Sequence, residues 1–299
     1  SDLGGSLRIP AAFCGVVGFR TTPGLIPIYP TLLAYDNLGV EGPMARTVRD
    51  TALMLSVIAG EDPRAPISFL CDPRTFLAAV ASPEIRGLKA AWSPDLKIIP
   101  GDREVQAIAA RAAHRVTELE CSVEEAEPDL RNVREVIYVT RSLRMLASHA
   151  DKLANWREKM NPNLVWNIEQ GFTLTPQRIA EAEKERTNLY RRVREFFNRF
   201  DLLLTPTVAV PPFPVEMSYP QEINGKPLEN YTDWFLLTYA ITLTGYPAIS
   251  IPCGFTQEGF PVGLQIVGRK LAETTVLKAA AAFEAISPWQ DKRPPIAEG

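Results

Sequence analysis

Apolar residues recur at helical spacing in several stretches of this 299-residue chain. One such stripe runs from Thr47 to Gly60, and a second runs from Asp102 to Leu119. Thr and Asp are residue types that cap helix N-termini, and Gly is a common residue at helix ends, so both stretches are typical of amphipathic helices. The same spacing predicts further helices over 132–148, 176–200 and 272–286.

Short, continuous apolar runs lie between these helices. They indicate a strand followed by a turn at 87–94, a buried strand within 201–211 that stops at prolines, and strands at 248–252 and 262–268. This order of strands and helices predicts an α/β fold with a mixed central β-sheet flanked on both faces by α-helices. The chain contains no internal repeat and no long linker, so we expect residues 1–299 to form a single large domain.

The first fifteen residues, SDLGGSLRIPAAFCG, combine a Gly-Gly pair with a serine. Because glycine is favoured where φ is positive or where other atoms approach closely, Gly4 and Gly5 predict a tight loop ending at Ser6. Pro10 suits the first position of a short helix, and Gly15 suits its end. Backbone N–H groups of such a loop can stabilise an oxyanion while a serine attacks a carbonyl, although helix capping is the commoner use of this pattern.

Composition excludes several classes of partner. The 32 basic and 35 acidic residues give a net charge of −3, which provides no basic surface for nucleic acid or an anionic membrane. No apolar run is long enough for a membrane span, and no signal peptide is recognisable, so we expect a cytoplasmic protein. The four cysteines are widely spaced, without metal-ligand spacing, and predict reduced thiols rather than a metal site.

A serine nucleophile needs a base, and the chain has two histidines, His114 and His149. Both fall within or at the end of predicted helices, outside any glycine-rich loop, so we expect both to be structural or surface residues. The G-x-S-x-G and S-x-x-K motifs of other serine hydrolases are absent. The sequence therefore argues against a histidine triad.

Five blocks of sequence resemble the amidase signature family. They are SDLGGSLRIPAAFCGVVGFRTTPG from residue 1, GPMARTVRD from 42, DLLLTPT from 201, TGYPAISIPCG from 244 and PVGLQIVG from 261. The segment of about 120–190 matches poorly and corresponds to the variable helical region that contributes to the family's substrate pocket. The resemblance thus covers nearly the whole chain in family order.

The resemblance implies hydrolysis of a carboxylic acid amide to an acid and ammonia or an amine. The family uses a Ser, cis-Ser, Lys triad and an acyl-enzyme, with no metal and no organic cofactor. Matching motif positions makes Ser6 the nucleophile and assigns the oxyanion hole to the backbone N–H groups of Leu3, Gly4, Gly5 and Ser6. Asp2 and Arg8 match positions that support this loop, Asp2 by accepting N–H bonds and Arg8 by donating to carbonyls or a carboxylate.

Two members of the family triad have no counterpart here. The family's lysine and its cis-serine, which lies in a GGSSGGS stretch, precede the nucleophile, whereas this chain has no lysine before Lys89 and no Gly-Ser-rich loop. The chain therefore resembles the C-terminal part of an amidase, beginning inside the signature motif. We expect it to be inactive alone and to require the N-terminal segment of the same enzyme as a partner.

Other interpretations remain open. Ser1 can be an N-terminal nucleophile whose own α-amine is the base. The chain can also be a non-catalytic fragment or inactive homologue, or resemble the A subunit of a glutamine amidotransferase that works in a complex. Which small-molecule amide is the substrate, and whether the protein forms a homo-oligomer, is left open. Trp156, Met160 and Trp166 are candidates for an apolar substrate pocket, although such residues are more often core.

Overall fold

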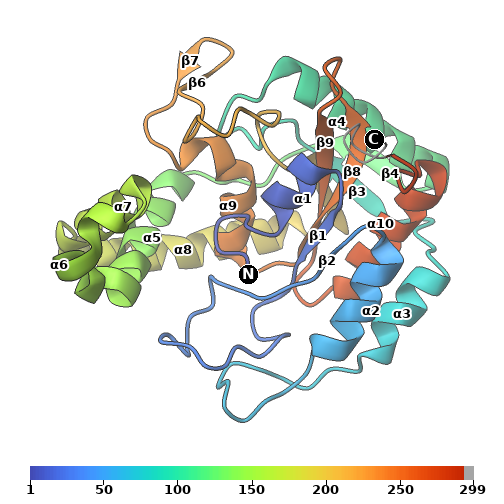
Figure 1. Cartoon of the computed structure of the whole chain (residues 1–299). Helices are drawn as coiled ribbons and strands as arrows, with labels where there is room; N and C mark the ends of the chain where they lie inside the picture. The colour runs from blue at the N-terminus through green and yellow to red at the C-terminus, as the bar shows by residue number, and fades with distance from the viewer. Residues whose placement is uncertain (293–299) are drawn as a thin grey trace.

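The computed structural model describes residues 1–292, and its centre is a seven-stranded sheet in the order β2-β1-β8-β9-β5-β3-β4 (Figure 1). The pairs β3–β4 and β3–β5 are parallel, and the remaining four pairs are antiparallel, so the predicted mixed sheet is confirmed. The strands are β1 (Val17–Arg20), β2 (Met44–Ala45), β3 (Lys89–Trp92), β4 (Ser122–Glu125), β5 (Leu202–Pro206), β8 (Ala248–Phe255) and β9 (Pro261–Gly268). A separate hairpin pairs β6 (Glu222–Ile223) with β7 (Lys226–Pro227).

Helices cover both faces of the sheet, as the sequence predicts. They are α1 (Arg8–Cys14), α2 (Val48–Ile58), α3 (Arg74–Ala81), α4 (Arg103–Arg115), α5 (Val133–His149), α6 (Leu153–Trp156), α7 (Pro162–Phe172), α8 (Pro176–Phe196), α9 (Leu236–Thr244) and α10 (Glu273–Ile286). Figure 1 shows α2, α3 and α10 together at one side of the molecule and α5 to α8 at the other.

Two apolar cores follow from the alternation of side chains along each strand. On β5, Leu202 and Leu204 pack into the core formed with α2, α3, α4 and α10. The intervening Leu203 points to the opposite face and joins the core formed with α5, α8 and α9. The central strands are therefore buried on both sides, which is why they read as continuous apolar runs.

The predicted helix ends agree with the capping residues that the structure contains. The hydroxyl of Thr47 accepts the Asp50 N–H at 3.0 Å, and a carboxylate oxygen of Asp102 accepts the Glu104 and Val105 N–H groups at 2.9 and 3.0 Å. Gly15 ends α1 in the left-handed region, at φ +64°.

Several predicted boundaries differ from the structure. The first helix begins at Arg8 rather than at Pro10, because the Gly5 carbonyl already accepts the Ile9 N–H at 2.7 Å. The helix expected over 176–200 ends at Phe196, and the one expected over 102–119 finishes as a 3₁₀ turn at 116–119. Among residues 1–292, no helix combines the length and the apolar character that crossing a bilayer requires.

Candidate functional site

The loop before α1 holds Ser6 at the protein surface while burying its neighbours. Ser6 is exposed, whereas Asp2, Gly4, Gly5 and Leu7 are buried. The loop is anchored at its start, where Asp2 and Val40 exchange two backbone hydrogen bonds of 2.7 and 3.1 Å. The serine hydroxyl is thus exposed to solvent on a short segment, which is fixed at one end by the Asp2–Val40 bonds and continues at the other into α1.

Crowding explains the two glycines. Gly5 has φ +127°, and a Cβ there would lie 2.4 Å from the Thr238 hydroxyl and 2.6 Å from Ile9 Cδ1. A Cβ on Gly4 would lie 3.1 Å from the Phe235 ring, and the Thr238 hydroxyl donates to the Gly4 carbonyl at 2.6 Å. The start of the chain therefore packs directly on α9, which leaves no room for a side chain at Gly5 and little at Gly4.

The backbone N–H groups of this loop are free to act as donors. Within the described part of the chain, the N–H groups of residues 3–6 donate no hydrogen bond, whereas the next N–H, that of Leu7, donates to the Asp2 carboxylate at 3.3 Å. Four consecutive backbone donors thus lie next to an exposed serine hydroxyl. Fixed N–H donors beside a nucleophile are what stabilisation of a developing oxyanion requires.

A buried ion cluster of Asp2, Arg8 and Arg20 supports the loop from the protein interior. Arg8 donates Nε and Nη2 to the two Asp2 carboxylate oxygens at 3.0 and 2.8 Å, and Arg20 Nη1 lies 3.3 Å from the same carboxylate. Arg8 also donates to the Thr238 carbonyl at 2.8 Å and to Gln265 Oε1 at 2.6 Å. Arg8 thus bonds a carboxylate and a carbonyl, and Asp2 accepts one loop N–H, that of Leu7. The cluster ties the loop to both α9 and β9.

The two guanidinium groups of this cluster stabilise the charge of the Asp2 carboxylate between them. Burial acts to raise the pKa of Asp2, but the adjacent Arg8 and Arg20 guanidinium groups outweigh burial and hold that pKa well below its ordinary value. Burial, together with the neighbouring charge of Arg8, lowers the pKa of Arg20 to about 10. Asp2 is therefore a fixed anion rather than a proton carrier at neutral pH.

An open pocket of about 520 Å³ lies beside Ser6. Helix α5 and the 3₁₀ turn Asp233–Phe235, which precedes α9, form its wall, and the loop of residues 3–6 and α1 form the rest. Its lining is mainly apolar, apart from the serine and one arginine, and comprises Leu3, Gly4, Ser6, Ile9, Pro10, Arg141, Met145, Trp234 and Phe235. Among residues 1–292, no lysine or histidine lines this pocket.

The candidate pocket residues from the sequence do not line this pocket. Trp156 is 54% exposed and lies under Lys159, and Met160 follows it in the same segment. Trp166 packs edge-on against Tyr138 and Tyr231. Sequence reasoning missed the lining residues Arg141, Met145, Trp234 and Phe235. The first two lie four residues apart in the predicted helix 132–148, so their shared face could have been found.

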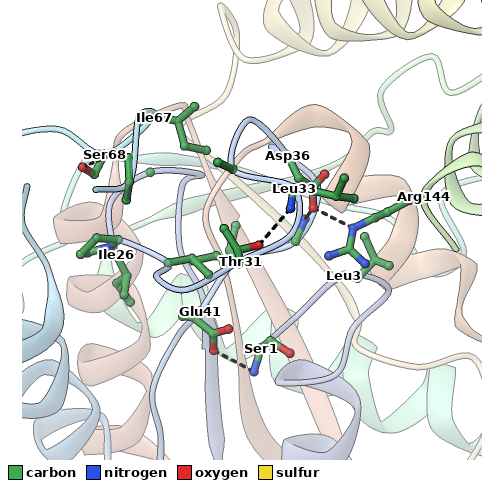
Figure 2. Close-up of a pocket in the computed structure, with 17 residues that line it drawn as sticks. Ser1, Leu3, Ile26, Thr31, Leu33, Asp36, Glu41, Ile67, Ser68 and Arg144 are labelled. Atoms are coloured by element: carbon green, nitrogen blue, oxygen red, sulfur yellow. Dashed lines mark hydrogen bonds and ion pairs between the residues drawn. The ribbon is translucent and has the colours of Figure 1, made fainter. Parts of the chain in front are cut away.

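A second, smaller pocket of about 250 Å³ lies at Ser1, and Figure 2 shows the residues around it. The charged groups there are paired with one another: the Ser1 amino group lies 3.2 Å from Glu41, and Arg144 donates to Asp36 at 2.7 Å. Ser1 and Ser6 therefore lie in different pockets, and Leu3 lines both.

The two histidines lie away from the Ser6 pocket. His114 is exposed on α4, and His149 lies near Lys152 at the end of α5. Burial and the Lys152 charge lower the pKa of His149. Neither side chain lines the pocket, which agrees with the expectation that both are structural or surface residues.

Comparison with known proteins identifies the family. The family model described as Amidase matches residues 1–277. The chain belongs to the amidase family. An acylamidase of Rhodococcus erythropolis is 38% identical over 98% of this chain and 62% of its own length. The A subunit of glutamyl-tRNA(Gln) amidotransferase from Synechococcus sp. (strain JA-2-3B'a(2-13)) is 33% identical over the whole chain and 61% of its own length.

Solved amidase structures have the same fold. A bacterial aryl acylamidase of the amidase signature family superposes with a TM-score of 0.87 at 30% identity, over 98% of this chain and 64% of that protein. A 6-aminohexanoate cyclic dimer hydrolase superposes with a TM-score of 0.83 at 25% identity, over 99% and 65%. The chain thus spans somewhat less than two thirds of the length of these relatives.

The crowding at Gly5 leads to a first prediction. In Gly5→Ala, the new methyl group meets a Thr238 hydroxyl that cannot move away, because it donates to the Gly4 and Phe235 carbonyls at 2.6 and 2.9 Å. We expect the free energy of unfolding, measured in urea, to be about 2–4 kcal/mol lower than that of the parent protein. We also expect Ser6 to lose its labelling by a fluorophosphonate.

Gly60→Ala is the matched control. Gly60 has φ +145°, but a Cβ there would meet nothing within 4 Å. This variant therefore carries backbone strain without crowding, and we expect it to keep the Ser6 reactivity of the parent protein. Equal loss of reactivity in both variants would contradict the explanation by crowding.

Proposed function

We propose that this protein hydrolyses a carboxylic acid amide through an acyl-enzyme on Ser6. The observation that carries this proposal is the exposed Ser6 hydroxyl next to the unpaired N–H groups of residues 3–6, at the wall of an open pocket. Membership in the amidase family and the similarity to an acylamidase support the same reaction class.

The reaction proceeds in two steps. Ser6 Oγ forms a bond to the amide carbonyl carbon while its proton passes to a base, and the N–H groups of residues 3–6 stabilise the negative oxygen. The C–N bond then breaks and the nitrogen leaves with a proton, as ammonia or an amine. Water attacks the resulting ester on Ser6, which releases the acid and restores the hydroxyl.

The base in this proposal comes from outside the present 299 residues. Within the described residues, no lysine or histidine lines the Ser6 pocket, and the relatives extend well beyond the matched region. The family resemblance assigns the base to a lysine acting through a cis-serine upstream of the nucleophile. Asp2 does not serve instead, because both of its carboxylate oxygens are bound to arginines in the interior.

This assignment predicts that residues 1–299 expressed alone have no amidase activity. A serine without its base is a weak nucleophile, and loss of a single triad member typically lowers turnover about 10⁴- to 10⁶-fold. The measurement compares release of acid and amine by this segment with release by the full-length polypeptide that carries it. Equal activity per mole in a soluble 299-residue preparation would overturn the assignment of the base.

Chemical labelling tests the nucleophile directly. The full-length protein is incubated with a fluorophosphonate, digested and mapped by mass spectrometry. We expect one modified peptide, beginning in the SDLGGSLR stretch and carrying the label on Ser6. Labelling of another serine, or none under conditions in which amides are turned over, would overturn the proposed function.

The similarity to amidotransferase A subunits supports a second candidate, release of ammonia from glutamine within a larger complex. For this second candidate we expect glutamine to be hydrolysed in preference to an acyl anilide, and for the first the reverse. Assaying glutamine and acetanilide with the purified protein separates the two candidates.

A further inference from the structure

Arg141 is the one charged side chain in the lining of the pocket beside Ser6, and the proposed mechanism does not use it. It lies on α5, four residues before Met145, and both side chains line the same pocket wall. The other lining residues are apolar apart from the serine itself and the loop backbone. Burying a charge that has no counter-ion costs free energy. A cation in an apolar pocket is therefore expected to serve a function, such as binding an anionic group.

The guanidinium is held in a fixed orientation. Arg141 Nε donates to Asn167 Oδ1 at 3.1 Å and to the Tyr231 hydroxyl at 2.9 Å. Asn167 is itself fixed, since its amide nitrogen donates to the Asn163 carbonyl at 2.5 Å. The rings of Tyr231, Phe235 and Tyr239 surround the guanidinium at 5.5 to 5.7 Å from its central carbon. Every one of these contacts fixes the Nε side or the faces of the group.

The outer edge of the guanidinium is left without a partner. Within residues 1–292, Nη1 and Nη2 of Arg141 donate no hydrogen bond and lie within 4.0 Å of no carboxylate. Neither nitrogen is among the fully buried polar atoms that lack a partner, so both keep some exposed surface beside the pocket. The edge of an arginine that carries two parallel N–H groups fits a carboxylate in a bidentate manner.

The other arginines of the same helix behave differently. Arg134 pairs with Asp233, and Arg144 pairs with Asp36. Of these three α5 arginines, the one that lines the Ser6 pocket is thus the one left without a carboxylate partner. On this helix, the fold thus supplies an acidic partner to Arg134 and Arg144 but none to Arg141 among the described residues.

We propose that Arg141 recognises a carboxylate of the substrate, and that this protein acts on amides that carry such a group. The inference rests on the proposed function, because it places the scissile amide at Ser6 and the carboxylate at Arg141 in one pocket. The apolar lining from Leu3, Met145 and Trp234 then contacts the hydrocarbon or aromatic part between the two groups. Arg141 is a specificity-determining residue here and takes no part in proton transfer.

Two pairs of amides test this inference with the full-length protein. Glutaramate against butyramide places the carboxylate in the acyl part, and 4-acetamidobenzoate against acetanilide places it in the amine part. Within each pair, the members differ by that carboxylate alone. We expect kcat/KM of the charged member to exceed that of the neutral member about 10- to 100-fold in at least one pair, as for other charge-assisted hydrogen bonds.

Variants at Arg141 assign that preference to one side chain. In Arg141→Met, the ratio of charged to neutral kcat/KM should fall toward one, mainly through a higher KM for the charged amide. Arg141→Lys keeps the charge but loses the bidentate geometry, so its ratio should lie between those of the parent and Arg141→Met. Arg178→Met is the matched control, because Arg178 lies on the nearby α8, pairs with Glu135 and does not line the pocket. Its ratio should equal that of the parent.

The outcomes separate the two proposals. Equal or better turnover of the neutral member in both pairs, or an unchanged ratio in Arg141→Met, overturns the role of Arg141 and leaves amide hydrolysis at Ser6 intact. Failure to hydrolyse any of the four amides, together with failure to label Ser6, overturns the proposed function and the inference with it.

Discussion

Ser6→Ala is expected to lower the kcat/KM of the full-length protein about 10⁴- to 10⁶-fold, the loss seen when a serine hydrolase loses its nucleophile. The reason is local: the N–H groups of residues 3–6 and the pocket remain in place, but no atom is left to form the acyl-enzyme. Because Ser6 is exposed, its hydroxyl can be removed without opening a cavity, so the thermal unfolding midpoint should not change. Activity and unfolding are measured on the same preparation.

Ser1→Ala is the control, and it tests the alternative of an N-terminal nucleophile. Ser1 lines a different pocket, where its amino group pairs with Glu41. We expect this variant to keep the turnover of the parent and to be labelled by fluorophosphonate on Ser6. If Ser1→Ala abolished turnover while Ser6→Ala kept it, the assignment of the nucleophile would be reversed.

Asp2→Asn is expected to destabilise the fold by about 3–5 kcal/mol, the usual effect of breaking a buried ion pair by removing one partner. The change leaves the Arg8 and Arg20 guanidinium groups buried side by side without their counter-ion. Urea unfolding at pH 7 measures the effect. Labelling of Ser6 should be lost as well, since the carboxylate that accepts the Leu7 N–H and the two arginines shapes the loop.

The pH dependence of this effect has a definite sign. The folded-state pKa of Asp2 is depressed, so its stabilisation is complete above the unfolded pKa of about 3.9 and is lost as the pH falls toward the folded value. The difference in stability between the parent and Asp2→Asn should therefore be constant from pH 5 to 7, as estimated from that linkage, and shrink below about pH 4.

Asp72→Asn is the matched control for Asp2→Asn. Asp72 also pairs with an arginine, Arg74, but at the protein surface, where 46% of the Asp72 side chain is exposed. We expect an unchanged urea midpoint, because exposed ion pairs contribute little. A similar loss in both variants would show that burial of the Asp2 cluster does not matter.

The elements that the sequence predicts well are those with a periodic pattern and a recognisable cap. The helices after Thr47 and Asp102 have both, and they begin where these caps predict. By contrast, α9 (Leu236–Thr244) is buried on all sides, so it has no polar face to set a period. The strand of 248–252 extends to Phe255, beyond Pro252, because a bulge between Pro252 and Gly254 lets the pairing with β9 continue.

The site divides in the same way. The tight loop could be predicted because Gly4, Gly5 and Ser6 lie together in the sequence, whereas a catalytic role for Ser6 came only from the family resemblance. The pocket wall could not, because Arg141 and Phe235 come together through the packing of α5 on α9, which no local pattern describes. Aromatic content alone led instead to Trp156, which the fold leaves at the surface.

The contacts of Arg8 also determine when the loop before α1 takes its shape. Its partners Thr238, Thr242 and Gln265 lie 230, 234 and 257 residues further along the chain. During synthesis from the N-terminus, the ribosome releases these partners long after the loop itself has emerged. In a partly made chain, the loop of residues 2–8 therefore lacks the contacts that order its backbone until the C-terminal strands have joined the sheet. The proposed site is thus completed late in folding, although its residues come first in the chain.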